Sequence, residues 1–456
     1  MTCWAVKEMA GATVPSARAL PNLAFVSNRI AEQPGLSLSA AAGHAGRQAA
    51  SRLFSNPKTE VSGLLQGHVS RVSERCAGHS LVLAAQDTTV VDYSGHVATE
   101  GLGPISYRDS VQGLLAHSSL IMTPNGCPLG VGHLDIWARS LEKKGSAAER
   151  RKKPTEQKES YKWIRGLHAT EQALAAYLDA GNRLLCIQDR EGDIFDLLAA
   201  QRHPGTDLLI RAAHPRMVEV AGRSGRLDLF TAVANAEVAG ECLVNIPRKE
   251  KSPARSATMV LRFQQVSVMP PQNGVKRPEA PPQIVTVIDA RERPQKEGDK
   301  EISWTLLTTL PVTDAASAAK IVNYYTRRWL IERLHYTLKS GLQIERLQFD
   351  DAHTLSNALA VYWIVAWRTL HLTHVAREEP NSPANKVLEA DELAVLEQTE
   401  SAPVTTTQQA IIAIAKLGGY RPTKNGAPPG AKSLWIGMRK LEAMAEFYRL
   451  IKHRIS

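Results

Sequence analysis

The segment Leu184-Leu-Cys-Ile-Gln-Asp-Arg-Glu-Gly-Asp193 indicates the fold class. It opens with a short apolar run of the length of a buried strand, and this run ends at Asp189. A helical apolar pattern begins at Ile194. A second apolar run, residues 80–85, ends similarly in Gln-Asp-Thr-Thr, with Asp87 as its acid. Two strands that end in aspartates predict an α/β domain with a ligand site at the strand ends.

Helical patterns precede this α/β part. Residues 1–74 read as a small helical module, in which one helix ends before Pro34 and another, residues 39–54, ends before Pro57. Its arginines are either DNA contacts or ordinary solvated side chains.

The pattern changes again after residue 210. Residues 211–310 alternate short β-like runs with Pro, Gly and charge, which predicts a β-rich insertion with loops at 248–251 and 269–274. After Lys339 the chain reads as helical. The expected helices there are residues 358–375, 408–417 and 434–451.

Composition favours a polyanionic partner. The 55 Lys and Arg residues exceed the 45 Asp and Glu residues by ten, and the pI is near 9.3. Residues 141–160 concentrate this charge and predict either a solvated loop or a contact with the DNA backbone. This basic run includes Lys143, Lys144, Arg150, Arg151, Lys152 and Lys153.

The cysteines and the N-terminus indicate a cytoplasmic protein. Five dispersed cysteines form no CxxC pair and no zinc spacing, so we expect free thiols in a reducing compartment. No signal-peptide layout is visible at the N-terminus, and no apolar run reaches the ~18 residues that a membrane span needs. The nucleoid of a bacterial cell would then be accessible.

Three carboxylates form a candidate metal site: Asp87, Asp189 and Glu332. Clustered carboxylates repel one another unless cations lie between them. Mg²⁺ needs only one or two carboxylates plus substrate phosphates, and a pair of such ions supports in-line displacement at phosphorus. Glu191 and Asp193 compete with Asp189, but Asp189 follows the apolar run directly.

Glu332 lies in a predicted helix that starts near Tyr325. Tyr325, Arg328, Glu332 and Lys339 fall close to one stripe of that helix. The adjacent flank is apolar and should face the core; it carries Leu330, Ile331, Leu334 and Leu338. This stripe suits a helix that ligates a metal and grips phosphates. Alternatively, Arg328 and Glu332 are an ordinary i,i+4 ion pair on a solvated face.

These residues resemble the Tyr-x2-Arg-x3-Glu-x6-Lys signature of bacterial cut-and-paste insertion-sequence transposases, which use a DDE catalytic triad and in several cases a hairpin intermediate. Asp87 and Asp189 look like the family's two catalytic aspartates. The similarity extends to three further segments, Leu53-Phe-Ser-Asn-Pro57, Lys158-Glu-Ser-Tyr-Lys-Trp163 and Leu417-Gly-Gly-Tyr420.

The resemblance implies an RNase H-like catalytic core at 75–364, interrupted by the β-rich insertion at 211–310. It implies a DNA-end-binding helical domain at 1–74 and a helical region at 365–456 that supports homodimerisation. Expected partners are double-stranded DNA, as inverted-repeat element ends and target, and Mg²⁺ with Mn²⁺ as a substitute. No membrane partner is expected.

The resemblance also implies further DNA contacts. Arg211 corresponds to an arginine near the active site, Trp304 to a tryptophan that stacks with a flipped base, and Trp329 to a tryptophan of the signature helix. Tyr325, Arg328 and Lys339 would hold phosphates beside the scissile bond. Two other functions stay open: a catalytically silent DNA-binding inhibitor of transposition, and a metal-dependent nuclease without strand joining.

Overall fold

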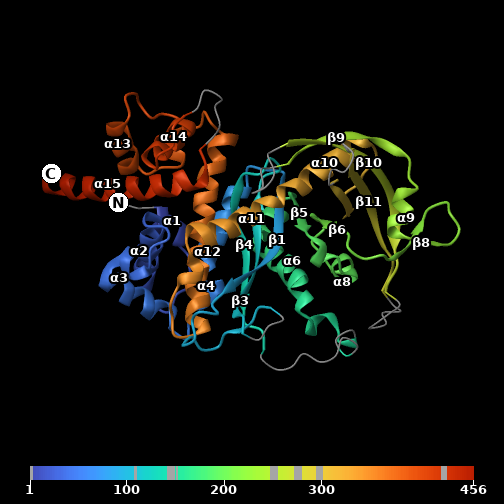
Figure 1. Ribbon diagram of the computed structural model, residues 1–456, viewed down its shortest axis with the longest axis horizontal. Helices are drawn as coiled ribbons and strands as arrows, with labels where there is room; N and C mark the ends of the chain where they lie inside the picture. The colour runs from blue at the N-terminus through green and yellow to red at the C-terminus, as the bar shows by residue number, and fades with distance from the viewer. Residues whose placement is uncertain are drawn as a thin grey trace. The chain divides into compact units, whose positions relative to one another are not determined.

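The structure, a computed structural model, describes residues 4–106, 110–140, 149, 152–246, 255–271, 280–293, 301–422 and 429–455 (Figure 1). Its contacts divide the chain into two compact units. Unit 1 consists of Met1–Gly78, Thr88–Leu141 and Leu330–Ser456, and unit 2 of His79–Asp87 and Glu142–Trp329. Four cations of the predicted basic run (Lys143, Lys144, Arg150 and Arg151) lie outside the described residues, as do loop 248–251 and residues 272–274.

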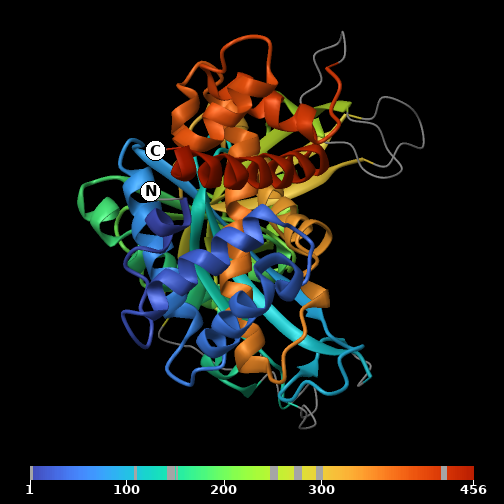
Figure 2. The same cartoon turned by 90° about the vertical axis from the view of Figure 1, so that its left-hand side faces the viewer.

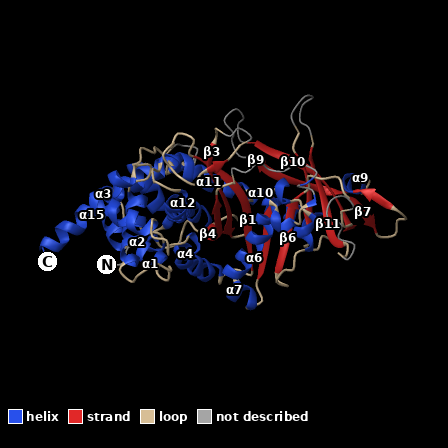
Figure 3. Ribbon diagram, turned by 90° about the horizontal axis from the view of Figure 1, so that it is seen from below, coloured by secondary structure: helices blue, strands red, loops and turns tan. Residues whose placement is uncertain are grey.

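Unit 2 is built on a mixed sheet, shown in red in Figure 3. Its parallel part consists of the first half of β1 (Leu81–Asp92), β5 (Arg183–Gln188) and β6 (Thr206–Arg211). Residues 184–187 and 208–210 are fully buried, which explains why these strands read as continuous apolar runs.

The sheet continues from β6 through antiparallel strands of the β-rich region. They are β12 (Ser303–Thr308), β11 (Gln283–Glu292), β10 (Arg255–Val268), β7 (Met217–Val220) and β8 (Arg226–Asp228), in this spatial order. β9 (Val238–Ile246) also pairs with β10. The β-like runs expected in residues 211–310 are therefore strands, and one short helix, α9 (Leu229–Ala234), lies among them.

The remaining helices of unit 2 are α6 (Lys162–Ala173), α7 (Ala175–Asp179), α8 (Phe195–Ala199) and α10 (Ala315–Arg327). α10 begins at a capping box, because the Asp314 carboxylate accepts from the Ser317 backbone N–H at 2.7 Å and the Ser317 hydroxyl accepts from the Asp314 N–H.

Unit 1 begins with four helices: α1 (Trp4–Met9), α2 (Ala19–Glu32), α3 (Leu38–Phe54) and α4 (Val61–Cys76). As the prolines predict, α2 ends before Pro34 and α3 before Pro57. Unit 1 also holds the second half of β1, β2 (Gly103–Pro104), β3 (Gln112–Met122) and β4 (Pro128–Trp137). β3 pairs antiparallel with β4 and with the short β2, and β1 is also its neighbour in the sheet.

The long helix α12 (Ala352–Glu378) is the central support of unit 1. It packs against α2, α3, α4 and β4, as Figure 2 shows for the blue helices beside the orange one. Because it is covered on most sides, most of its residues from Leu355 to Ala376 are buried. The expected helix at 358–375 is its apolar middle.

A C-terminal cluster completes unit 1. It comprises α11 (Trp329–Tyr336, of which all but Trp329 belong to unit 1), the π-helical turn η4 (Thr337–Gly341), α13 (Ala390–Thr399), α14 (Thr407–Leu417) and α15 (Ala431–Ile455). α14 and α15 cross closely: a Cβ on Gly437 would lie 1.8 Å from the Ile414 carbonyl oxygen. Within the described residues, no helix combines the length and apolar composition that crossing a bilayer requires.

Two details of the expected elements were wrong. Asp87 does not end its strand, because β1 continues through Thr88-Thr-Val-Val to Asp92. The helix from Tyr325 to Lys339 is not continuous: α10 ends at Arg327, α11 starts at Trp329, and Lys339 lies in the π-helical turn. A π-helical turn closes i→i+5 hydrogen bonds, so Lys339 does not keep the register of a regular stripe.

Candidate active site

The two predicted aspartates belong to neighbouring parts of the sheet: Asp87 lies in β1, and Asp189 directly follows the adjacent strand β5. β1 and β5 are parallel, with Ala85 opposite Ile187. One step further, the Gln188 side chain donates a hydrogen bond to Gln86 at 3.4 Å, and both side chains are fully buried. Successive side chains of a strand point to opposite faces. Asp87 and Asp189, each one residue beyond its glutamine, therefore share the other face.

Asp189 also fixes the backbone after β5. Its carboxylate accepts a hydrogen bond from the Glu191 backbone N–H at 2.8 Å and caps the short helix η3 (Arg190–Gly192). This bond leaves lone pairs of the partly exposed carboxylate for a ligand. Glu191 instead pairs with Lys162, with 3.2 Å between Oε2 and Nζ.

Asp193 has a different environment. Its side chain is fully buried and accepts from the backbone N–H groups of Ala213 (2.7 Å) and His214 (3.0 Å). The Arg216 guanidinium pairs with the same carboxylate and donates to the Asp193 carbonyl oxygen at 2.9 Å. Asp193 thus clamps the segment after β6, a role that its position in the sequence did not reveal.

A guanidinium lies beside the first aspartate. Arg328, at the C-terminal end of α10, places Nη1 3.6 Å from Oδ2 of Asp87, and both side chains are mostly buried. The ion pair places a positive charge directly beside this carboxylate. Arg328 and Asp87 both belong to unit 2.

Tyr325 is buried one turn before Arg328. Burial raises the pKa of its phenol, against the opposing effect of the Arg328 and Arg211 charges, and Asp189 lies close enough to raise it further. The Trp304 ring packs edge-on against the Tyr325 ring, with 5.5 Å between centroids. Arg211 donates to the Ser303 carbonyl oxygen at 3.1 Å. Asp87, Asp189, Arg211, Trp304, Tyr325 and Arg328 thus form a connected set within unit 2.

Three predicted residues lie on the segment that follows. Trp329 is partly buried at the start of α11, and Glu332 lies in the first turn of α11, in unit 1. The flank expected to face the core is buried, with Leu330, Ile331, Leu334 and Leu338 at most 9% exposed. Lys339 pairs with Glu345 at 3.3 Å, and Glu345 also accepts from the Asp92 backbone N–H.

The donor set suits a hard divalent cation. Asp87 and Asp189 offer oxygen ligands from adjacent strands, and Mg²⁺ commonly takes one or two carboxylates and completes its shell with water and phosphate oxygens. Arg328 already places positive charge at Asp87. Among the described residues, no three His, Cys, Asp or Glu side chains gather closely enough to hold a metal by themselves.

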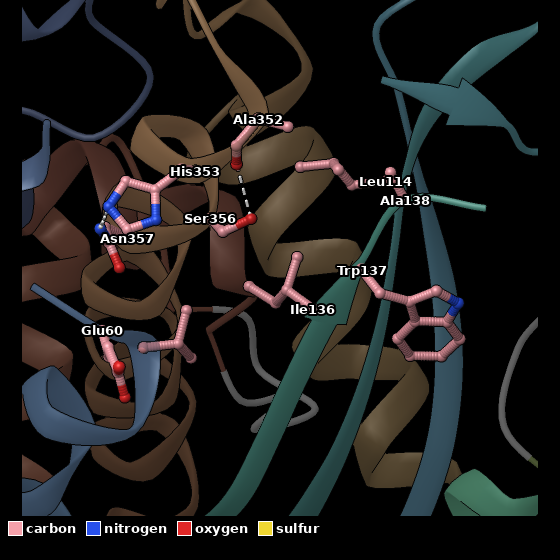
Figure 4. A pocket seen from close by; sticks show the side chains of 10 residues that line it. Glu60, Leu114, Ile136, Trp137, Ala138, Ala352, His353, Ser356 and Asn357 are labelled. Atoms are coloured by element: carbon pink, nitrogen blue, oxygen red, sulfur yellow. Dashed lines mark hydrogen bonds between the residues drawn. The ribbon is translucent and has the colours of Figure 1, made fainter. Parts of the chain in front are cut away.

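A separate pocket of about 300 Å³ lies within unit 1 (Figure 4). Leu114 and Ile136 form its apolar wall, and Glu60, His353, Ser356 and Asn357 supply polar groups. The Ser356 hydroxyl donates to the Ala352 carbonyl oxygen at 2.7 Å. None of the predicted site residues lines this pocket.

Comparison with known proteins identifies the family. Residues 138–367 match the family model described as transposase DDE domain. The match spans just over half of the 456 residues, and the chain belongs to this family. The matched span contains Asp189 and Glu332, whereas Asp87 lies before it.

One similar solved structure is a piggyBac transposase synaptic complex with hairpin DNA. The similarity covers 70% of this chain, with a TM-score of 0.34 and 7% sequence identity. It covers 52% of the piggyBac transposase chain, so this chain spans about half the length of that protein.

Proposed function

We propose that this protein is a DNA transposase that cleaves the ends of a mobile element and joins them to target DNA by two-metal-ion phosphoryl transfer. The observation that carries the proposal is the pair Asp87, in β1, and Asp189, directly after the neighbouring parallel strand β5, in a chain of the transposase DDE domain family. An acidic pair in this position is suited to metal-assisted chemistry at a phosphodiester.

An RNase H-like core is part of the proposal. The parallel strands β1, β5 and β6 and the antiparallel pair β3 and β4, with β1 as the neighbour of β3, support it. The β-rich segment between β6 and α10 would be the family's insertion. We further propose that residues 1–74 bind element ends, that residues 365–456 support a homodimer on DNA, and that the protein acts at the nucleoid of a bacterial cytoplasm.

Asp87, Asp189 and Glu332 would hold Mg²⁺, or Mn²⁺ in its place. The bound ions would supply an activated water or hydroxyl and would stabilise the leaving oxygen. The chain's own groups orient the DNA. Arg328 offers planar N–H donors to a phosphate beside the scissile bond, and Lys339 offers a point charge that Glu345 now balances.

Trp304, Arg211 and Tyr325 form the side of the site that we assign to a bent DNA end. Trp304 is partly exposed, and its contact with Tyr325 is edge-on rather than a face-to-face stack. An aromatic face beside the site can stack an extruded base, which compensates for part of the cost of unstacking. This arrangement supports the proposed hairpin intermediate, with Trp329 as a further DNA contact.

The test replaces Glu332 with Gln, which removes one charge and keeps the shape. We expect nicking of element ends in Mg²⁺ to fall to near background while end binding is retained. If Glu332→Gln nicks element ends at the wild-type rate, the assignment of Glu332 as a metal ligand is wrong. Wild-type protein that binds ends without cutting them would support the inhibitor, and cutting without joining would support the nuclease.

A further inference from the structure

An exposed arginine–aromatic group lies on α11 of unit 1. The Arg333 guanidinium carbon is 5.4 Å from the centroid of the Tyr336 ring. Tyr336 is 50% exposed, and its ring stacks on Trp435 of α15 with 6.1 Å between centroids and 30° between planes. Trp435 is held against the backbone at Gly341, where a Cβ would lie 2.8 Å from the indole. Arg333 is therefore supported by a fixed aromatic pair.

A second arginine lies close enough to repel Arg333. Arg377 is in the last turn of α12 and is exposed. Partial burial lowers the pKa of Arg377, and the charge of Arg333 lowers it further. Both arginines also contribute to the low pKa of His374, about 4, whose main cause is burial. These three side chains thus form a local concentration of basic groups.

The positive charge of Arg333 and Arg377 has no carboxylate in an ion pair with it among the residues that the structure describes. Other arginines of unit 1 do have carboxylate partners, as Arg29 has in Glu32 and Glu446. The helix macrodipole favours a cation near each helix C-terminus. The macrodipole explains why each helix ends with an arginine, but it does not explain why two arginines lie close enough to repel each other. A bound anion would offset this repulsion.

We propose that Arg333 and Arg377 bind one phosphate group of the DNA backbone, with Tyr336 as a positioning residue that keeps the Arg333 guanidinium in place. The N–H donors of a guanidinium lie in its own plane, so a guanidinium that packs over a ring can still donate two hydrogen bonds to phosphate oxygens. The proposal rests on the proposed function, because it takes the phosphate from DNA. Free inorganic phosphate presents the same chemistry, so the experiment separates the two sources.

The first measurement is the salt dependence of binding to a short duplex by Arg333→Gln and Arg377→Gln. Loss of one phosphate contact should reduce the slope of log K against log salt by about one. Raising the salt from about 50 to about 200 mM lowers the affinity of every protein for the duplex. The factor by which it falls should be ~3.5-fold smaller for each variant than for wild type. The matched control is Lys386→Gln, whose lysine is exposed but already paired with Glu379.

Tyr336 provides the positioning test. Tyr336→Phe keeps the ring and should retain the wild-type slope, whereas Tyr336→Leu should lower the slope as Arg333→Gln does. Equal slopes for wild type and both arginine variants would overturn the proposal. If Tyr336→Leu only damages the fold, its melting temperature should fall, but the folded protein should bind duplex with the wild-type salt dependence.

Inorganic phosphate, at constant ionic strength, distinguishes the ligand source. If it raises the melting temperature of wild type but not of Arg377→Gln, while both bind duplex with equal slopes, the site takes free phosphate and the DNA assignment is wrong. The proposed function has an independent outcome. If these variants change the slope but the wild-type protein cleaves no strand, the proposed phosphate site is supported and the proposed transposase function is wrong.

Discussion

At the scale of single residues, two glutamine–aspartate pairs determine the geometry of the site. Gln86 and Gln188 hydrogen-bond across buried strands, and the aspartate after each glutamine faces the opposite way. The sequence shows the repeated Gln-Asp but not the register that aligns it. Register comes from pairing between residues about a hundred positions apart, which a local pattern does not contain.

Asp189 and Asp193 allow a direct comparison between a carboxylate that we propose to be catalytic and a carboxylate that supports the fold. Asp193→Asn should destabilise unit 2 by roughly 3–5 kcal/mol, because it leaves Arg216 without its buried partner. Asp189→Asn should change stability by less than about 1 kcal/mol, because Asn also caps helices, yet it should abolish cleavage. Urea unfolding and end nicking of both variants would check this. Equal unfolding midpoints for the two variants would contradict the assignment.

At the scale of elements, the prolines predicted where α2 and α3 end, and periodicity located α12 and α15 but missed their outer turns. The breaks around α11 were not predictable in this way. The π-helical turn ends at Gly341, which packs against Trp435 of a helix about a hundred residues away. β1 was expected to stop at Asp87 because apolar residues stop there. It continues because Thr88, Thr89 and two valines are β-branched and β3 lies beside them.

The crossing of α14 and α15 predicts a steric effect. Gly437→Ala should push these helices apart, because its Cβ would overlap the Ile414 carbonyl oxygen. We expect a loss of roughly 1–3 kcal/mol in the free energy of unfolding. Gly430→Ala is the control, since nothing lies within 4 Å of its Cβ. Thermal unfolding of both variants would test this, and equal melting temperatures would argue against so close a crossing.

Three buried glutamates join α2, α13 and α15, and they predict a pH effect. Burial raises the pKa of Glu32 to about 8 and that of Glu392 to about 7. Glu442 has a lowered pKa despite burial, because the other two hydrogen-bond to it. The charged groups around them are Arg29, Arg368, Asp391, Glu446, Arg449 and Lys452.

A raised carboxyl pKa stabilises the fold below the unfolded value of 4.5, and this stability is lost as pH rises through about 8. Glu32→Gln stays neutral, so its stability relative to wild type should increase between pH 5 and pH 8.5, by up to about 1.4 kcal/mol per pKa unit. Urea midpoints at both pH values measure this, with Glu74→Gln, an exposed pair member, as the control. A pH-independent difference would show that Glu32 is ionised throughout.

At the scale of the whole molecule, an excess of ten positive charges is what we expect of the DNA-binding protein that we propose, and the chain belongs to the transposase DDE domain family. Composition and motif predicted this class, since both are local properties of the sequence. They did not predict two compact units with β1 running through both. Such an assembly depends on contacts between segments that are distant along the chain.

Removal of divalent cations tests whether the proposed cleavage reaction depends on a metal. Chelation with EDTA should abolish end cleavage while duplex binding persists, because contacts of Lys and Arg with phosphates do not need the ions. Added Mg²⁺ or Mn²⁺ should restore cleavage in wild type but not in Asp87→Asn. Cleavage that continues in excess chelator would rule out the metal-dependent mechanism.

The order of segments in the two units has a consequence for synthesis on the ribosome. Unit 2 ends at Trp329, so it can fold while later residues are still being translated. Unit 1 includes the first 78 residues but also everything from Leu330 onward. Its N-terminal helices can pack on one another and on β4 early, but they cannot complete their packing until α12 emerges from the exit tunnel. A ribosome that stalls before Leu330 would release a chain whose unit 2 can fold but whose first helices lack their partner.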